Sequence, residues 1–77
     1  MAQDSKYGQI DIPGIPADEP VFIIRGKDVA APEAVRGYAE EAGLMGASAD
    51  FQRSVESRAN EIEAWQEDNA SLCDIPD

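Results

Sequence analysis

The chain has 77 residues and a net charge of -10, from sixteen acidic and six basic side chains. It has no histidine and a single cysteine, Cys73, which excludes an internal disulfide and the usual zinc ligand sets. The negative charge argues against direct binding of nucleic acid, since such a surface must be basic. A domain of this size buries only a thin core, and self-association is the remaining way to stabilise it.

Residues 1–20 are rich in proline and glycine, and the prolines at 13 and 16 restrict the residues before them to extended or turn conformations. We expect an extended arm that docks on another surface, which could belong to a neighbouring subunit. No basic-then-apolar leader opens the sequence, and no apolar run approaches the length of a bilayer span. The sequence therefore predicts a cytoplasmic protein without membrane contact.

Residues 21–25 are the best strand candidate, because β-branched and aromatic residues dominate them. Both faces of this strand would be apolar, and a lone strand leaves its backbone groups unsatisfied. It could pair with residues 9–12 of the same chain or with its own copy in another subunit. We favour pairing between subunits.

Two helices are predicted next. Pro32 suits the first position of the first helix, and Gly43 suits the position just past its end. Ser48 can cap the second helix, which ends near Asn69. The link over residues 44–47 is short enough to make the pair an antiparallel hairpin. The second helix carries one apolar stripe, made of Phe51, Val55, Ala59, Ile62 and Trp65.

Together these elements predict an α+β fold: an arm over residues 1–20, a strand plus helical hairpin over 21–69, and a tail over 70–77. The apolar stripe is predicted to be core or subunit interface, and the alternative is an exposed stripe that enters a partner's groove. The predicted interface of a homo-oligomer comprises Val21, Phe22, Ile23, Ile24, Phe51, Val55, Ile62 and Trp65.

The only concentrated positive charge is Arg25-Gly26-Lys27, between the predicted strand and the first helix. An arginine fork, a lysine, the exposed Gly26 amide and a helix N-terminus together offer donors to a phosphate or carboxylate. The predicted ligand site is therefore Arg25, Gly26, Lys27 and Asp28. In the alternative interpretation, the two bases pair with Asp28, Glu33 or acids of the arm.

No constellation for catalysis is present. The carboxylate pairs at 40–41 and 61/63 fall on helices and are best explained as solvated faces. The serines have no histidine to activate them, and Cys73 lies among acids without a base. The sequence therefore predicts a protein that is not an enzyme, with no cofactor and no metal.

Two motifs resemble those of a known group of proteins. They are Asp11-Ile12-Pro13-Gly14-Ile15-Pro16 continuing through Glu19-Pro20-Val21-Phe22-Ile23-Ile24-Arg25-Gly26 to Asp28, and Trp65-Gln66-Glu67-Asp68-Asn69. Over about residues 7–69 the chain resembles a recurrent family of short phage and prophage proteins of unsettled function. The resemblance implies a viral accessory setting in the host cytoplasm and no particular chemistry.

Three functions fit these observations. The first is counter-defence by sequestration, in which an oligomer gathers Arg25 and Lys27 around an anionic, nucleotide-type host signal. The second is an acidic mimic of DNA that occupies the nucleic-acid channel of a host protein. The third is an oligomeric structural or regulatory protein without a ligand. We rank sequestration first, because the basic pair lies where strand and helix meet.

Overall fold

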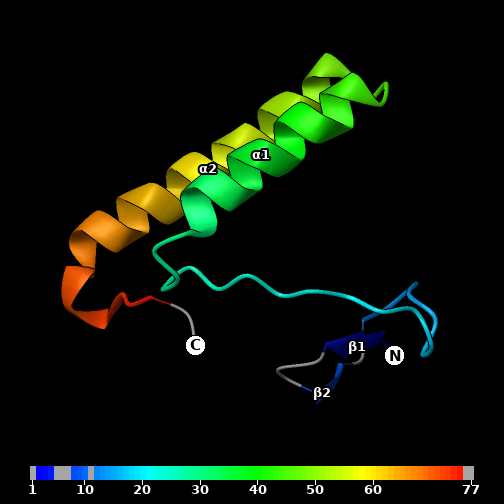
Figure 1. Cartoon of the computed structure of the whole chain (residues 1–77), viewed down its shortest axis with the longest axis horizontal. Coiled ribbons are helices and arrows are strands. Elements are labelled where there is room, and N and C mark those ends of the chain that lie inside the picture. The colour runs from blue at the N-terminus through cyan, green and yellow to red at the C-terminus, as the bar shows by residue number, and fades with distance from the viewer. Residues whose placement is uncertain (1, 5–7, 11, 76–77) are drawn as a thin grey trace.

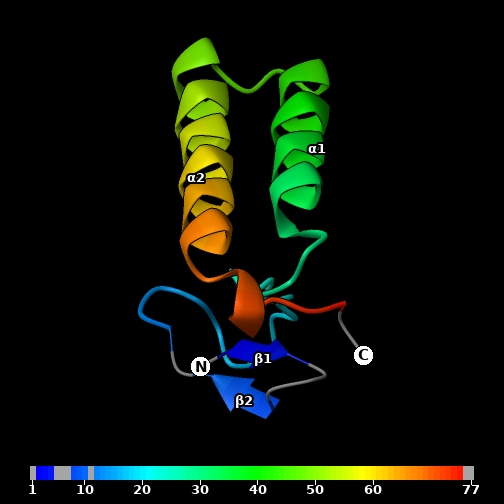
Figure 2. The ribbon, with the colours of Figure 1, turned by 90° about the vertical axis from the view of Figure 1, so that its left-hand side faces the viewer.

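The computed structural model describes residues 2–4, 8–10 and 12–75. Its body is an antiparallel pair of helices, α1 (Ala31–Leu44) and α2 (Ala49–Asp68), which lie side by side along their length (Figures 1 and 2). A single 3-10 turn, η1 (Ala70–Leu72), follows α2 and contacts it. The predicted helical hairpin is confirmed. We call the end with the α1–α2 loop the tip and the opposite end the base.

The predicted α+β class is wrong, because the fold is a helical hairpin and, within the described ranges, no sheet packs on it. Residues 21–25, the predicted strand, form no strand, and Phe22 is 81% exposed. β-Propensity measures how side chains fit a pleated surface and does not supply the second strand that a ladder needs. Pairing of this segment between subunits stays a prediction.

The N-terminal arm contains a short ribbon. Strands β1 (Ala2–Asp4) and β2 (Gly8–Ile10) pair antiparallel, with Ala2 opposite Ile10. They contact each other and neither helix. A stretch of residues without helix or strand leads from the ribbon to the base of the hairpin (Figure 1). The ribbon is therefore a local feature of the arm, and no second layer covers the hairpin among the described residues.

Helix α1 begins at Ala31, one residue before the predicted Pro32, and continues past the predicted end to Leu44. The placement of Gly43 just past the helix was therefore wrong. The left-handed conformation falls three residues later, at Gly46, with φ +105°. Gly43 instead makes room for α2, since a Cβ atom there would come 2.3 Å from Oε1 of Gln52.

Helix α2 begins and ends as predicted. The Ser48 hydroxyl accepts a hydrogen bond from the Phe51 backbone N–H at 3.0 Å, which satisfies one of the free donors of the first turn. The helix ends at Asp68, with Asn69 as its cap. Ser48 therefore fixes where the chain re-enters a helix after the tip.

The seam between the helices is built from small residues. Ala31, Ala39 and Ala59 are fully buried, Pro32 is buried, and larger apolar side chains such as Val55 remain partly exposed. Alanine lets the two helix backbones approach closely but removes little apolar surface from water. Among the described residues no large side chain is fully buried. The core is therefore as thin as the length of the chain predicts.

Candidate functional site

The four residues of the predicted ligand site lie at the base of the hairpin, where the chain turns into α1. The backbone N–H of Asp28 donates to the carbonyl of Arg25 at 3.1 Å, which closes a turn over residues 25–28. The Asp28 carboxylate accepts from the N–H of Ala30 at 2.8 Å, and the Asp28 carbonyl accepts from Ala31 at 2.9 Å. The turn over residues 25–28 therefore leads directly into the N-terminus of α1. The sequence predicted the ligand site at this junction.

Gln66 of α2 ties this turn to the hairpin. Its Nε2 donates to the carbonyl of Gly26 at 2.9 Å and to the carbonyl of Asp28 at 2.7 Å. The neighbouring Trp65 ring lies beside the turn, since a Cβ atom at Gly26 would be 3.8 Å from Trp65 Cε3. The partly buried Gln66 amide thus joins segments 38 and 40 residues apart in sequence.

Sequence analysis missed Gln66, although helical spacing could have found it. Gln66 lies seven residues after Ala59 and four after Ile62, so it falls on the stripe that faces α1. A polar side chain on a buried stripe needs hydrogen-bond partners, because an unpaired buried amide is costly. Its partners, two backbone carbonyls, are not encoded by any residue type, so the sequence does not identify them.

The C-terminal segment lies beside the same turn. The N–H of Asp74 donates to the carbonyl of Lys27 at 3.0 Å, and the N–H of Val29 donates to the carbonyl of Asp74 at 3.1 Å. The Lys27 ammonium and the Asp74 carboxylate form an ion pair at 3.3 Å. Lys27 is therefore ion-paired, as the alternative interpretation expected, but with Asp74 instead of Asp28 or Glu33.

Arg25 differs from the other bases of the described chain. The ion pairs are Lys27 with Asp74, Arg36 with Glu33 and Glu63, Arg53 with Asp50, and Arg58 with Glu61. Arg25 is exposed and is the only basic side chain of the described residues that has no ion-pair partner there. In a chain with a net charge of -10, an unpaired guanidinium is the group best suited to bind an anion from solution.

Arg36 joins the two helices nearer the base. Its guanidinium donates to Glu33 at 2.8 Å, to Asn60 at 3.0 Å and to Glu63 at 3.1 and 3.2 Å. The hydrogen bond from Arg36 holds the pKa of the Glu63 carboxyl below its ordinary value, and the pKa of Arg36 is raised in turn. Glu63 was predicted on a solvated face, and it is exposed, but its carboxylate also bonds across to Arg36 of α1. Arg36 is therefore already paired with two carboxylates, Glu33 and Glu63.

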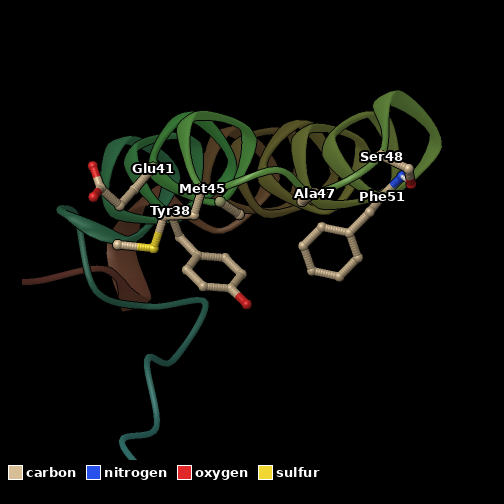
Figure 3. A pocket seen from close by; sticks show the side chains of 7 residues that line it. Tyr38, Glu41, Met45, Ala47, Ser48 and Phe51 are labelled. Atoms are coloured by element: carbon tan, nitrogen blue, oxygen red, sulfur yellow. Dashed lines mark hydrogen bonds between the residues drawn. The ribbon is translucent and has the colours of Figure 1, made fainter.

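An apolar hollow of about 460 Å³ lies at the tip, on the opposite end from Arg25 (Figure 3). The rings of Tyr38 and Phe51 meet edge to face with centroids 6.1 Å apart. The hollow is lined by Tyr38, Glu41, Ala42, Met45, Ala47, Ser48 and Phe51. Glu41 is its only charged lining residue. The hollow suits an apolar group, and the Glu41 carboxylate disfavours an anion.

The residues of the predicted oligomer interface fall into two groups. Val21, Val55 and Ile62 are partly buried, and the last two lie in the α1–α2 seam. Phe22, Ile23, Ile24, Phe51 and Trp65 are exposed. The exposed group is divided between the base and the tip, so the structure does not bring the eight residues together on one surface of the single chain.

Neither described helix is long and apolar enough to cross a membrane. Within residues 2–4, 8–10 and 12–75, no group of three or more His, Cys, Asp or Glu side chains could hold a metal ion. No protein family, no curated protein and no solved structure matches the chain. The similarity to short phage proteins therefore stays a prediction based on the two motifs.

Proposed function

We propose that this chain is a non-enzymatic binding protein that self-associates and sequesters a small anionic, nucleotide-type host signal, in the setting of phage counter-defence. The observation that carries the proposal is the state of Arg25, which is exposed and without an ion-pair partner in the described chain. Every other base there already neutralises a carboxylate. A guanidinium is planar, and two of its N–H groups can donate parallel hydrogen bonds to two oxygens of one phosphate.

The surroundings of Arg25 favour a nucleotide over a simple anion. Phe22 and Ile24 are exposed in the same segment, and Trp65 beside the Gly26 turn is 43% exposed. Aromatic and apolar side chains next to a phosphate-binding base provide a surface on which a nucleobase can stack. An inorganic anion would gain nothing from them.

Self-association is supported by how little the chain covers of its own apolar surface. Over residues 12–75 the fully buried apolar side chains are alanines, while Phe22, Leu44, Met45 and Ile75 are each at least 78% exposed. Contacts between copies would remove these side chains from water, and each large side chain buried contributes about 1.5–3 kcal/mol. A site built from several subunits would also place several Arg25 side chains around one ligand.

A panel of nucleotides, including ADP-ribose and cyclic nucleotides, tests the binding function through the melting temperature. A ligand present at 100 times its Kd should stabilise the fold by about 2.7 kcal/mol. Arg25→Ala should remove the shift. Arg58→Ala is the matched control, because Arg58 is also exposed but pairs with Glu61 on α2. Survival of the shift in Arg25→Ala would assign the ligand to another site.

The oligomeric mass at low concentration tests the assembly. Native mass spectrometry or sedimentation at nanomolar to micromolar concentrations should give a mass above the 8.3 kDa of the single chain. Phe22→Ser should lower the mass, since it replaces the most exposed apolar side chain of the 21–24 segment with a polar one. A stable monomer at nanomolar concentration would contradict the assembly.

An acidic mimic of DNA is the second candidate, favoured by the carboxylates along the outer faces of the helices. The exposed acids of the two helices include Glu40, Glu41, Asp50, Glu56, Glu61, Glu67 and Asp68. A mimic requires a host nucleic-acid-binding partner whose affinity for the chain falls steeply with salt and which DNA displaces. Arg25→Ala should leave that affinity unchanged or raise it, which separates the two candidates.

A further inference from the structure

We infer that Gln66 is the positioning residue of the proposed anion site: its amide fixes the turn over residues 25–28 on α2 and thereby sets where Arg25 is presented. The inference deepens the proposed function and rests on it for the ligand-binding part of its test. The position of the turn relative to α2 is a separate, structural part that can be tested without a ligand.

On α2, the hydrogen-bond geometry assigns this role to one group, the Gln66 amide. Gly26 and Asp28 present carbonyl oxygens, which only accept, so the donor end of the Gln66 amide must face them. Nε2 carries two hydrogens, and both are used. Among the described residues these are the only side-chain hydrogen bonds between α2 and residues 25–29.

The two bonds hold the turn on both sides of Lys27. Arg25 is the first residue of that turn, because its carbonyl accepts from the N–H of Asp28. With the carbonyls of Gly26 and Asp28 held by Gln66, the turn that begins at Arg25 is restrained relative to α2. A base held in place before the ligand arrives binds more tightly than one that must be ordered on binding.

Gln66→Glu is the decisive variant, because it replaces two donors with a carboxylate that faces two carbonyl oxygens. Trp65, the only tryptophan, lies beside Gly26 and reports whether the turn is docked. We expect its emission to shift to longer wavelength as the turn moves away. Affinity for ADP-ribose, measured by calorimetry, should fall roughly tenfold or more, since two hydrogen bonds are lost.

Two further variants distinguish the positioning role of Gln66 from a nonspecific loss of stability. Gln52→Glu makes the same change on the same helix near the tip, where Gln52 lies against Gly43, and should leave both readouts as in the wild type. Gln66→Met keeps the length of the side chain but has no donor, so it should weaken ADP-ribose binding without introducing a charge.

Lowering the pH provides a rescue that is specific to Gln66→Glu. Two facing carbonyls raise the pKa of the introduced carboxyl, and its protonated form donates to one of them. Moving from pH 7 to pH 5 should therefore return the Trp65 emission toward that of the wild type. The other carboxylates of this region, Asp28, Asp74 and Glu63, are present in both variants, so Gln66→Met should show no such recovery.

Wild-type emission and affinity in Gln66→Glu would overturn the inference, as would an equal loss in Gln52→Glu or an acid recovery shared by Gln66→Met. If the wild type binds no ADP-ribose or any other nucleotide of the panel, the proposed function fails. The Trp65 emission of the three variants still decides whether Gln66 holds the turn.

Discussion

The tip and the base of the hairpin are held by different kinds of interaction. At the tip, the link is fixed by its own backbone: Gly46 adopts φ +105°, the N–H of Ala47 donates to the carbonyl of Ala42 at 2.9 Å, and Ser48 caps α2. At the base, Gln66 and Asp74 hold the turn over residues 25–28 from 38 to 47 positions away. The tip is specified locally, and the base depends on contacts between distant segments.

This difference has a functional consequence. The α1–α2 link is held by local geometry, so no distant segment packs on it to hold it in place. The side chains around the tip, including Leu44 and Met45, are exposed. A turn held by distant polar contacts can be placed accurately relative to a helix, which the proposed binding role of Arg25 would require. Arg25 lies at the end of the molecule where such contacts exist.

The largest loss of folding free energy is expected from a substitution in the α1–α2 seam, which joins the tip to the base. Ala59→Leu adds three carbons at a fully buried position against α1, and overpacking of this kind costs about 1–3 kcal/mol. Both ends should lose stability together, since they share this seam. Urea unfolding at fixed protein concentration measures the change in the free energy of unfolding.

Ala64→Leu is the control for the seam, because Ala64 is an exposed residue of the same helix. Both alanine and leucine are good helix formers, so its free energy of unfolding should stay within about 0.5 kcal/mol of the wild type. An equal loss in both variants would show that the helices do not pack at Ala59.

The contrast between tip and base also explains what the sequence could predict. The hairpin follows from apolar spacing and from the Ser48 cap, which act within a few residues. The prediction of a strand over residues 21–25 was wrong, because a strand forms only beside a second strand and the sequence does not identify one. Arg25 was found from its charge, but the ion pair of Lys27 with Asp74 and the two acceptors of Gln66 depend on how distant segments meet.

The second prediction concerns the local geometry of the tip. Gly46→Ala places a Cβ atom at φ +105° and should destabilise the hairpin by about 1–2 kcal/mol. Gly37→Ala, in open space within α1, should stabilise it by up to about 1 kcal/mol, because alanine favours the helix. Changes of the same sign in thermal unfolding would contradict the assignment of the tip turn to Gly46.

The third prediction concerns the cap at the tip. Ser48→Ala removes the acceptor for the Phe51 N–H and should cost about 1 kcal/mol. Ser57→Ala, at an exposed position inside α2, is the control and should be neutral or slightly stabilising. Hydrogen exchange of the first turn of α2 should accelerate in Ser48→Ala alone. Unchanged exchange there would mean that the tip does not depend on this cap.

The smallest effect is expected near the base, at Glu63, and it depends on pH. The hydrogen bond from Arg36 holds the pKa of Glu63 below its unfolded value of about 4.3. A carboxyl with a lowered folded pKa stabilises the fold above the unfolded pKa, and this stabilisation is lost as the pH falls through the folded pKa. The melting temperature of Glu63→Gln should therefore lie below that of the wild type at pH 7, and the gap should close below about pH 4.

Glu61→Gln shows whether the contact between helices matters. Glu61 pairs with Arg58 within α2, so its loss leaves α1 and α2 joined, whereas Glu63 bonds across to Arg36 of α1. Exposed ion pairs within one helix contribute little to stability. At pH 7 the melting temperature of Glu61→Gln should therefore lie closer to that of the wild type than the melting temperature of Glu63→Gln does. Equal gaps at pH 7, or a Glu63→Gln gap that does not narrow as the pH falls from 7 to 3, would show that the Arg36 contact does not join the helices.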